Sequence, residues 1–417
     1  MKIEDLHSLY IQHGLVDTDT RNIRLNTVFF ALKGANFNGN KFAEEALSKG
    51  AKYAIVDEIK YKTSDNIILV ENVLKSLQEL ASYHRKYLKI PIIALTGSNG
   101  KTTTKELINV VLSSKYKTIA TVGNLNNHIG VPLTLLSMDS STEIGIVEMG
   151  ANHLNEISFL SKIVSPDYGY VTNFGSAHLE GFGSIEGVIK GKSELYDFIE
   201  ENNRKAFINT EDKIQVEKTK GIQTICFNDS IKFIESNPFV KLSFYNEEIT
   251  SKLIGSYNFA NISAAITIGN YFKVTKEEIK NVIENYIPSN NRSEIIETNN
   301  NKIILDAYNA NPTSIKAALN SFVEYKTDHK TIILGDMFEL GEFSSIEHQK
   351  VVDFVSSANF DSVFFVGSNF SETISNHLKF KTLAALEKYL LNEPIKNSTI
   401  LIKGSRGVAL EKIVPYC

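Results

Sequence analysis

An apolar segment, a glycine-rich loop and a helical pattern follow one another without a break between residues 90 and 114. The apolar segment is IPIIALTG, the loop continues through SNGKT, and the helical pattern is TTKELINVVLSS. This order is typical of a phosphate site, because backbone N–H groups of the loop and the positive end of the helix both face the anion. We expect Lys101 to neutralise phosphate oxygens and the Thr102 hydroxyl to ligate Mg²⁺. The segment therefore predicts an α/β domain that binds a nucleotide.

The loop has the short form G-x-x-G-K-T at residues 97–102, because Leu95 stands where the longer pattern has its first glycine. A glycine-rich turn with a chance lysine is the structural alternative. The strand pattern before the loop and the helical pattern after it favour the phosphate site.

Strand-like and helical patterns alternate along most of the chain, which predicts the α/β class. We expect three domains: a small α/β domain at 1–72, a central domain at 73–288 and a Rossmann-like α/β domain at 289–417. The central domain is expected to have a parallel sheet with its ligand loops at the carboxyl ends of the strands. VLKSLQELASYHRKYL at 73–88 predicts a helix, and IPSNNRSE at 287–294 predicts a hinge. Segment 202–250 is less periodic and gives no detailed prediction.

Composition excludes several classes of protein. The chain has 417 residues, a net charge of −4 and only two cysteines, Cys226 and Cys417. A mildly acidic chain without a basic block is a poor candidate for nucleic-acid binding, and two distant cysteines fit a reducing compartment. We expect no membrane span and no signal peptide, since Glu4 and Asp5 stand where positive charge would be needed. The expected location is the cytoplasm.

Three polar residues lie at or after predicted strands of the central domain, namely Glu148, His178 and Lys192. Each alone has an ordinary structural explanation, as a strand terminus, a loop histidine or a solvated lysine. Beside a phosphate loop, they indicate a carboxylate and an imidazole near a nucleotide-bound metal. The loop TVGNLNNHIG adds amide groups for a polar ligand from Asn124, Asn126 and Asn127, although an asparagine-rich turn would look the same.

The last third of the chain offers further candidates near predicted strands. Arg292 could form a fork with phosphate and Asp306 could accept from ribose hydroxyls, although isolated residues of these types are more often surface ions. The NANP turn contributes Asn309 and Asn311 as substrate candidates. KGSRG at 403–407 could hold a carboxylate through Lys403, Ser405 and Arg406, or it could be a solvated loop.

Several strings, taken in order, resemble the Mur ligases of bacterial cell-wall synthesis. They are TGSNGKTTTKE, GNLNNHIGVPLTLL, EMGANHLNEI, TNFGSAHLEGFGS and GKSELY in the central domain. LDAYNANPTSIKAAL, LGDMFELG and KGSRGVALEKIV extend the resemblance to the last domain, and DTDTRNIRLNTVFFALKGANFNGNKF extends it to the first. The resemblance thus covers nearly the whole chain.

The resemblance implies a role for each matching residue. The nucleotide would be held by Gly97, Ser98, Asn99, Gly100, Lys101, Thr102, Thr103, Asn261, Arg292 and Asp306. Two Mg²⁺ ions would be held by Thr102, Glu148, His178 and Lys192, the last as a CO₂-derived carbamate. Lys101, His178 and Lys192 would form the catalytic set, and Asp19, Thr20 and Arg21 would bind the nucleotide sugar. The residues before Arg292 depart from the glycine that is common in the family, as does Thr20 from serine.

The GNLNN and DAYNANP strings favour one activity within the family. It is the ATP-dependent joining of D-alanyl-D-alanine to UDP-MurNAc-tripeptide through an acyl phosphate, by a monomer. Two rival functions are left open: a sister ligase that adds another amino acid, including glutamate to folate, and a nucleotide-binding switch without ligase activity.

Overall fold

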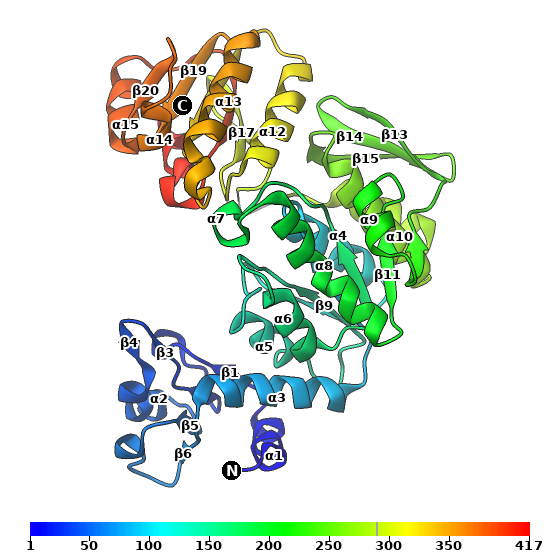
Figure 1. Ribbon diagram of the computed structural model, residues 1–417, viewed down its shortest axis with the longest axis vertical. Coiled ribbons are helices and arrows are strands. Elements are labelled where there is room, and N and C mark those ends of the chain that lie inside the picture. Colours follow the sequence, from blue (N-terminus) through cyan, green and yellow to red (C-terminus); the bar gives the residue numbers. More distant parts are fainter. Residues whose placement is uncertain (289–290) are drawn as a thin grey trace.

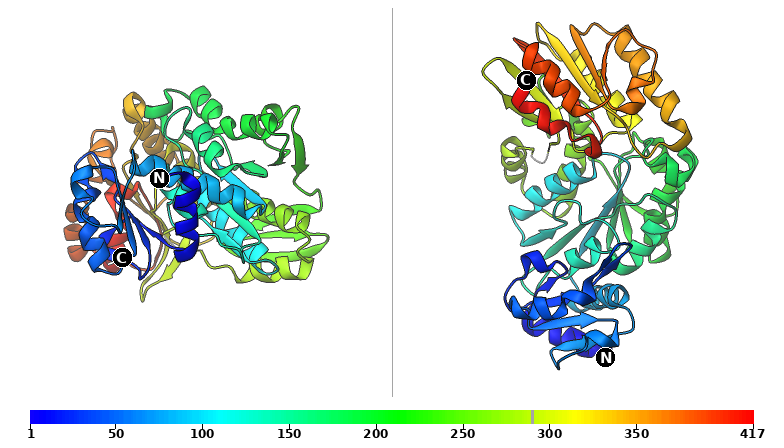
Figure 2. Two further views of the ribbon diagram at one scale, coloured as in Figure 1. Left: turned by 90° about the horizontal axis from the view of Figure 1, so that it is seen from below. Right: turned by 90° about the vertical axis from the view of Figure 1, so that its left-hand side faces the viewer.

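The computed structural model describes residues 1–288 and 291–417. Three mostly parallel sheets, each covered by helices, follow one another along the long axis of the molecule (Figures 1 and 2). The predicted domain boundary and hinge include residues 289–290, which lie outside the described residues. In the part of the chain that the structure describes, no helix is long and apolar enough to cross a membrane.

The first sheet has the strand order β1-β2-β5-β6, and all its strand pairs are parallel. Successive side chains of a strand point to opposite faces, so Phe29 packs in a small core with α2 while Val28 and Phe30 face α1 and α3. The elements are α1 (Ile3–His13), β1 (Val16–Asp17), β2 (Val28–Phe30), β3 (Lys33–Gly34), β4 (Phe37–Asn38), α2 (Ala43–Ser48), β5 (Tyr53–Val56) and β6 (Ile67–Leu69).

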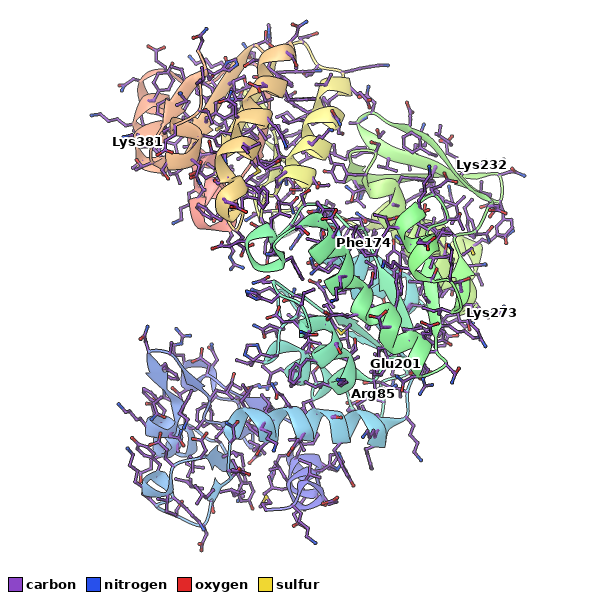
Figure 3. All side chains as sticks on the ribbon, in the orientation of Figure 1. Arg85, Phe174, Glu201, Lys232, Lys273 and Lys381 are labelled. Atoms are coloured by element: carbon purple, nitrogen blue, oxygen red, sulfur yellow. The ribbon has the colours of Figure 1, made fainter. Side chains whose placement is uncertain are left out.

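Helix α3 (Val73–Leu88) joins the first sheet to the central domain and has the bounds that the sequence predicts. Asn72 begins it by accepting a hydrogen bond from the Lys75 N–H at 2.8 Å, which satisfies one of the free donors of the first turn. Its apolar face, including Leu77 and Leu80, is fully buried among α1, α5 and α6. Arg85 lies near the far end of the helix, where it meets the central domain (Figure 3).

The central sheet is parallel with the order β12-β11-β10-β7-β9-β8. Helices α4 and α10 pack on one face around Leu107 and Ile262, and α5, α6 and α8 cover the other around Leu160 and Leu195. The elements are β7 (Ile92–Thr96), α4 (Lys101–Ser113), β8 (Thr118–Ala120), α5 (Gly130–Leu135), β9 (Ile144–Glu148), α6 (Glu156–Val164), β10 (Tyr168–Val171), α7 (Leu179–Phe182) and α8 (Ile185–Glu201).

The segment without a detailed prediction, 202–250, completes this sheet and begins a second one. Strands β13, β14 and β15 form an antiparallel sheet that packs on α11. Their alternation is visible in β14, where Val240, Leu242 and Phe244 are buried and their neighbours are partly exposed. The elements are β11 (Lys205–Ile208), α9 (Lys213–Lys218), β12 (Gln223–Cys226), β13 (Ile231–Ser236), β14 (Phe239–Phe244), β15 (Glu247–Ile254), α10 (Asn258–Tyr271) and α11 (Lys276–Asn285).

The last sheet has the order β16-β17-β21-β18-β19-β20, with only the edge strand β16 antiparallel. One face packs on α12 and α13 through Phe322 and Val352, and the other on α15 and the C-terminal turns through Leu386 and Ile413. The elements are β16 (Glu294–Glu297), β17 (Asn301–Asp306), α12 (Pro312–Glu324), β18 (Lys330–Gly335), α13 (Ser344–Ser357), β19 (Ser362–Val366), α14 (Ser368–Ser371), β20 (Leu378–Phe380), α15 (Leu383–Asn392) and β21 (Ser398–Lys403).

Candidate functional site

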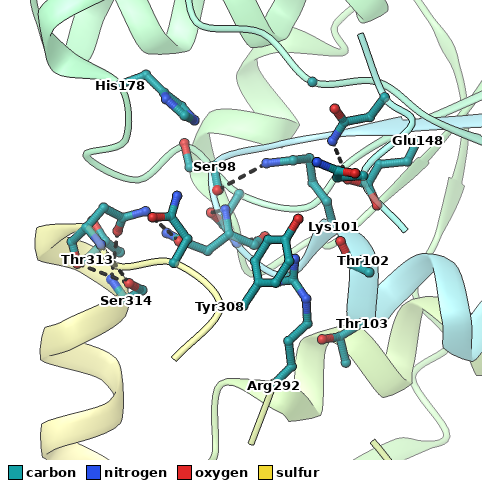
Figure 4. A pocket seen from close by; sticks show the side chains of 18 of the residues that line it. Ser98, Lys101, Thr102, Thr103, Glu148, His178, Arg292, Tyr308, Thr313 and Ser314 are labelled. Atoms are coloured by element: carbon teal, nitrogen blue, oxygen red, sulfur yellow. Dashed lines mark hydrogen bonds between the residues drawn. The ribbon is translucent and has the colours of Figure 1, made fainter. Parts of the chain in front are cut away.

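A cavity of about 580 Å³ lies between the central and last domains, beyond the carboxyl ends of the central strands. Its central-domain wall includes Lys101, Glu148 and His178, and Arg292 and Tyr308 lie on the opposite side (Figure 4). Crevices at the carboxyl ends of parallel strands are the usual ligand sites of such folds. Most residues that the sequence predicts for ATP therefore meet in one place.

The glycine-rich loop is shaped by two glycines with positive φ, Gly97 at 141° and Gly100 at 77°. A Cβ atom on Gly97 would lie 2.0 Å from the Thr172 hydroxyl oxygen, so only glycine fits against the tip of β10. Ser98 donates its hydroxyl to the Gly175 carbonyl at 2.7 Å, which fixes the loop further. The backbone is thus held open at the start of α4, as an anion site requires.

Lys101 lies in the first turn of α4 and donates its amine to the Gly97 carbonyl at 2.7 Å. Burial lowers the pKa of Lys101, while the nearby Glu148 carboxylate acts in the opposite direction. Among the described residues the acceptors of this cation are loop carbonyls, which it can exchange for phosphate oxygens with little movement.

Glu148 ends β9 and is 1% exposed. Asn126 donates its side-chain amide to Glu148 Oε1 at 2.8 Å, whereas Oε2 is buried and has no hydrogen-bond partner. An unpartnered buried carboxylate oxygen is costly unless a cation or donor reaches it. Together with the buried Thr102 hydroxyl on the same cavity, this oxygen fits an Mg²⁺ ligand set. Among the described residues, no group of three or more His, Cys, Asp or Glu side chains is arranged to hold a metal by itself.

His178 reaches the cavity from the loop before α7 and forms an ion pair with Glu339 of the last domain at 2.5 Å between Nδ1 and Oε2. The neighbouring His178 imidazole lowers the pKa of Glu339. The sequence pattern indicated His178 but not Glu339, which lies within the LGDMFELG string.

Lys192 does not line the cavity with the other three predicted metal ligands. Its side chain is fully buried in α8, donates to the Ala151 carbonyl at 2.9 Å and lies 5.1 Å from the centre of the Phe182 ring. Burial, and secondly the positive charge of Lys101, lower the pKa of Lys192 well below its ordinary range. The amine is therefore held close behind the wall that carries the other candidates.

The predicted nucleotide contacts of the last domain, Arg292 and Asp306, both line the cavity and each has a partner within that domain. The Arg292 guanidinium stacks 3.8 Å from the centre of the Tyr308 ring, a residue that the sequence analysis passed over within DAYNANP. Asp306 forms an ion pair with Lys403 at 2.6 Å, and both line the cavity. The sequence analysis had assigned these two residues to different ligands.

The three residues of the KGSRG loop do not meet as one carboxylate cradle. Lys403 forms an ion pair with Asp306. Ser405 is buried, and its hydroxyl oxygen accepts a hydrogen bond from the Phe338 N–H at 3.0 Å. Arg406 is exposed, with its guanidinium 5.4 Å from the centre of the Tyr308 ring. Of the three, only Lys403 lines the cavity.

The predicted asparagines fall on the cavity from both domains. Asn124, Asn126 and Asn127 line it from the loop before α5, and Asn309 and Asn311 line it from the turn before α12. Asn261 of α10 also lines it, and its Oδ1 accepts from the Thr104 hydroxyl at 3.0 Å. Thus the polar surface comes largely from amides, which can serve as donors or acceptors.

The predicted nucleotide-sugar residues lie in the first domain, away from this cavity. Asp19 begins a short turn by accepting from the Arg21 N–H at 2.9 Å, and the two side chains pair at 2.6 Å. This interaction lowers the pKa of Asp19 to about 2. The Thr20 carbonyl accepts from the Lys49 amine at 2.9 Å.

Comparisons with known proteins show what the chain is similar to. Residues 95–269 match the family described as Mur ligase middle domain, and residues 291–406 match the Mur ligase, glutamate ligase domain. The UDP-N-acetylmuramoyl-tripeptide–D-alanyl-D-alanine ligase of Bacillus subtilis is 35% identical over 96% of this chain and 92% of its own length.

Two solved structures share the whole arrangement of domains. MurF from Acinetobacter baumannii superposes with a TM-score of 0.86 at 30% identity, over 96% of this chain and 92% of its own. MurF ligase from Thermotoga maritima, in complex with ADP, superposes with a TM-score of 0.86 at 26% identity, over 97% of both chains. With these matches spanning nearly every residue, the chain belongs to the Mur ligase family.

Proposed function

We propose that this protein is the ATP-dependent ligase that joins D-alanyl-D-alanine to UDP-MurNAc-tripeptide in peptidoglycan synthesis. The observation that carries the proposal is the shared cavity, where Lys101 and Glu148, with its unpartnered Oε2, meet asparagines of two domains. Relatives of that name match over almost their full length, which supports the same substrates here. A cytoplasmic location is part of the proposal, because the reaction draws on ATP and a nucleotide sugar.

Bound ATP would supply the phosphoryl group that converts the tripeptide carboxylate into an acyl phosphate, from which the dipeptide amine displaces phosphate. Two anions must approach each other in this reaction, so positive charge and orientation are the main requirements. Lys101 supplies charge at the loop carbonyls, and the Asn124, Asn126 and Asn127 amides can orient a polar substrate opposite it. Closure of the two domains around the cavity would keep water from the activated carboxyl group.

Mg²⁺ would be held by Thr102 and Glu148, with His178 as a further candidate, and would neutralise phosphate charge. The buried and unpartnered Glu148 oxygen supports the first two assignments. Because Nδ1 of His178 faces the Glu339 carboxylate, Nε2 would be the ring atom left to bind a metal.

A carbamate on Lys192 is a further part of the proposal. Only a neutral amine adds CO₂, releasing a proton and leaving an anion that can bind cations. The burial that lowers the pKa of Lys192 supports a neutral amine. Incubation with ¹³C-bicarbonate should give a carbamate carbon signal in the wild type that Lys192→Met lacks, and equal signals from both proteins would contradict the assignment.

The experiment that tests the function measures ADP release by the purified protein with UDP-MurNAc-tripeptide, with and without D-alanyl-D-alanine. We expect ADP, phosphate and the pentapeptide product only when both substrates are present. Single amino acids offered to the corresponding shorter acceptors test for a sister ligase. ATP binding without any amide product would favour the rival nucleotide switch and overturn the proposal.

A further inference from the structure

A second cavity, of about 560 Å³, lies at the amino ends of the central strands, whereas the nucleotide loop lies at their carboxyl ends. Its walls come from three segments that each lead into a strand: 85–91 before β7, 165–168 at the start of β10 and 203–205 at the start of β11. These three strands are parallel neighbours, so their amino ends lie side by side at the same end of the sheet. The cavity is therefore separate from the proposed active site, and an inference about it does not rest on the proposed function.

Positive charge dominates the lining of this second cavity. One carboxylate faces five cationic side chains, which are Arg85, Lys86, Lys89, Arg204 and Lys205. Like charges gathered around one cavity repel one another unless an anion enters. The excess is notable in a chain whose net charge is −4.

The single carboxylate, Asp167, is fully used in positioning two guanidinium groups. Its Oδ2 accepts from Arg85 Nη2 at 2.6 Å and from the Ile92 N–H at 3.0 Å, and Oδ1 lies 2.9 Å from Arg204 Nη1. Arg85 also donates to the Val164 carbonyl at 3.1 Å, and its side chain is 8% exposed. Because the Arg85 guanidinium is buried and held by these contacts, it places a fixed positive charge at the base of the cavity.

The lysines at the rim of the cavity are not held by carboxylates among the described residues. Lys86 and Lys89 are exposed, and neither forms an ion pair among the described residues. Lys205 donates to the Tyr271 hydroxyl at 3.3 Å, a neutral partner. The flexible lysine amines at the rim can therefore bind an anion from several directions while the Arg85 guanidinium stays fixed beneath it.

The C-terminal end of α3 explains part of this charge without any ligand. Cations stabilise a helix C-terminus, and Arg85, Lys86 and Lys89 all lie in or just after the last turn of α3. The helix terminus does not explain Arg204 and Lys205, which come from a different segment and line the same cavity.

We propose that this second cavity binds a small phosphate-bearing anion. Charge, rather than a base, would be recognised, because the one aromatic ring in the lining is already packed. Tyr168 lies edge-on to Tyr271 and Phe272, with ring centres 5.5 Å and 5.3 Å away. Ile90 and Pro91 are the only aliphatic residues that line the cavity. Inorganic pyrophosphate has the required charge density and size.

Calorimetric titration of pyrophosphate into the full-length protein tests this proposal. The nucleotide loop is first saturated with a non-hydrolysable ATP analogue and Mg²⁺, so that only the second cavity is titrated. Lys86→Glu/Lys89→Glu should weaken pyrophosphate binding by about tenfold or more, because two attractions become repulsions. The control Lys62→Glu/Lys396→Glu makes the same change of charge at exposed lysines elsewhere and should leave binding unaltered.

Three results would overturn the proposal. They are no pyrophosphate binding to the loaded protein, equal weakening in the two double variants, and binding to phosphatidylglycerol vesicles without binding to pyrophosphate. Unchanged affinity of each variant for the ATP analogue, together with an unchanged melting temperature, shows that the fold and the first site are intact.

Discussion

The side-chain amide of Asn311, at the start of α12, donates to Asn99 Oδ1 in the nucleotide loop at 2.7 Å. Asn311 also begins α12, since its own Oδ1 accepts from the Ser314 N–H at 2.9 Å. One side chain therefore couples the first turn of a helix in the last domain to the phosphate loop of the central domain. The position of the last domain is in this way tied to the conformation of the loop.

Asn311→Ala should damage both roles. We expect loss of about 1 kcal/mol of unfolding free energy from the missing helix cap, and a several-fold rise in KM for ATP from the lost contact. Thr275→Ala is the matched control, because Thr275 and Glu278 form the same kind of capping box on α11, away from the cavity. Denaturant unfolding and steady-state kinetics check both variants. A KM raised equally in the two would mean that the Asn99 contact has no role of its own.

Tyr308 should contribute to nucleotide affinity by holding the Arg292 guanidinium, which lies 3.8 Å from its ring centre. Tyr308→Leu removes the aromatic face and should raise KM for ATP about 3- to 10-fold, corresponding to roughly 1 kcal/mol of cation–π stabilisation. Tyr308→Phe keeps the face and should retain near-normal KM. Loss of affinity in the Phe variant as well would point to the hydroxyl instead.

Lys192→Ala should reduce kcat strongly, by about 100-fold or more if the residue takes part in charge stabilisation at the reacting groups. Lys190→Ala, two residues away on the exposed side of α8, controls for the loss of a lysine from the same helix. Initial rates of ADP release at saturating substrates compare the two. Wild-type activity in Lys192→Ala would refute its role in catalysis.

Acid should weaken the contact between α1 and α3. His7 Nε2 and His84 Nδ1 lie 3.1 Å apart, and burial lowers the pKa of both imidazoles. For His84 this effect is partly offset by the hydrogen bond with the Met138 carbonyl and, secondly, by Asp139. Below the ordinary histidine pKa of about 6.5, the unfolded chain therefore binds protons that the folded protein resists, so stability falls as the pH drops through this range.

His84→Gln should consequently reduce the fall in melting temperature between pH 7.5 and pH 5.5. The contribution removed is expected to be of the order of 1 kcal/mol. His329→Gln, at an exposed site, serves as the control. The same pH dependence in the wild type and both variants would show that other groups determine acid stability.

Local patterns predicted the strands and helices well, because each reflects a short-range periodicity. Helix α3 and strand β7 lie where the apolar patterns at 73–88 and 90–97 place them. The β13–β15 sheet escaped prediction because its burial depends on α10 and α11, which follow it in the chain. The nucleotide loop could be predicted for the same reason, because its residue types and their spacing are also a short-range pattern.

Pairings between residues far apart in the chain could not be predicted in this way. The Lys403–Asp306 and His178–Glu339 pairs join residues 97 and 161 positions apart, and nothing local distinguishes such partners from solvated ions. The stacking of Arg292 on Tyr308 is of the same kind, since it depends on how a loop returns after β17. Contacts of this range arise only from the complete fold.

Helix α3 supplies apolar side chains to the core beneath the first sheet and also packs on α5 and α6 of the central domain. A fragment that stops at residue 72 would lose the surface that seals its own sheet. A fragment that stops at residue 88 would keep that surface but expose the face of α3 that normally meets the central domain. The N-terminal region is therefore poorly suited to separate expression, and a swap between related enzymes would need to exchange the matching surfaces of α5 and α6 along with it.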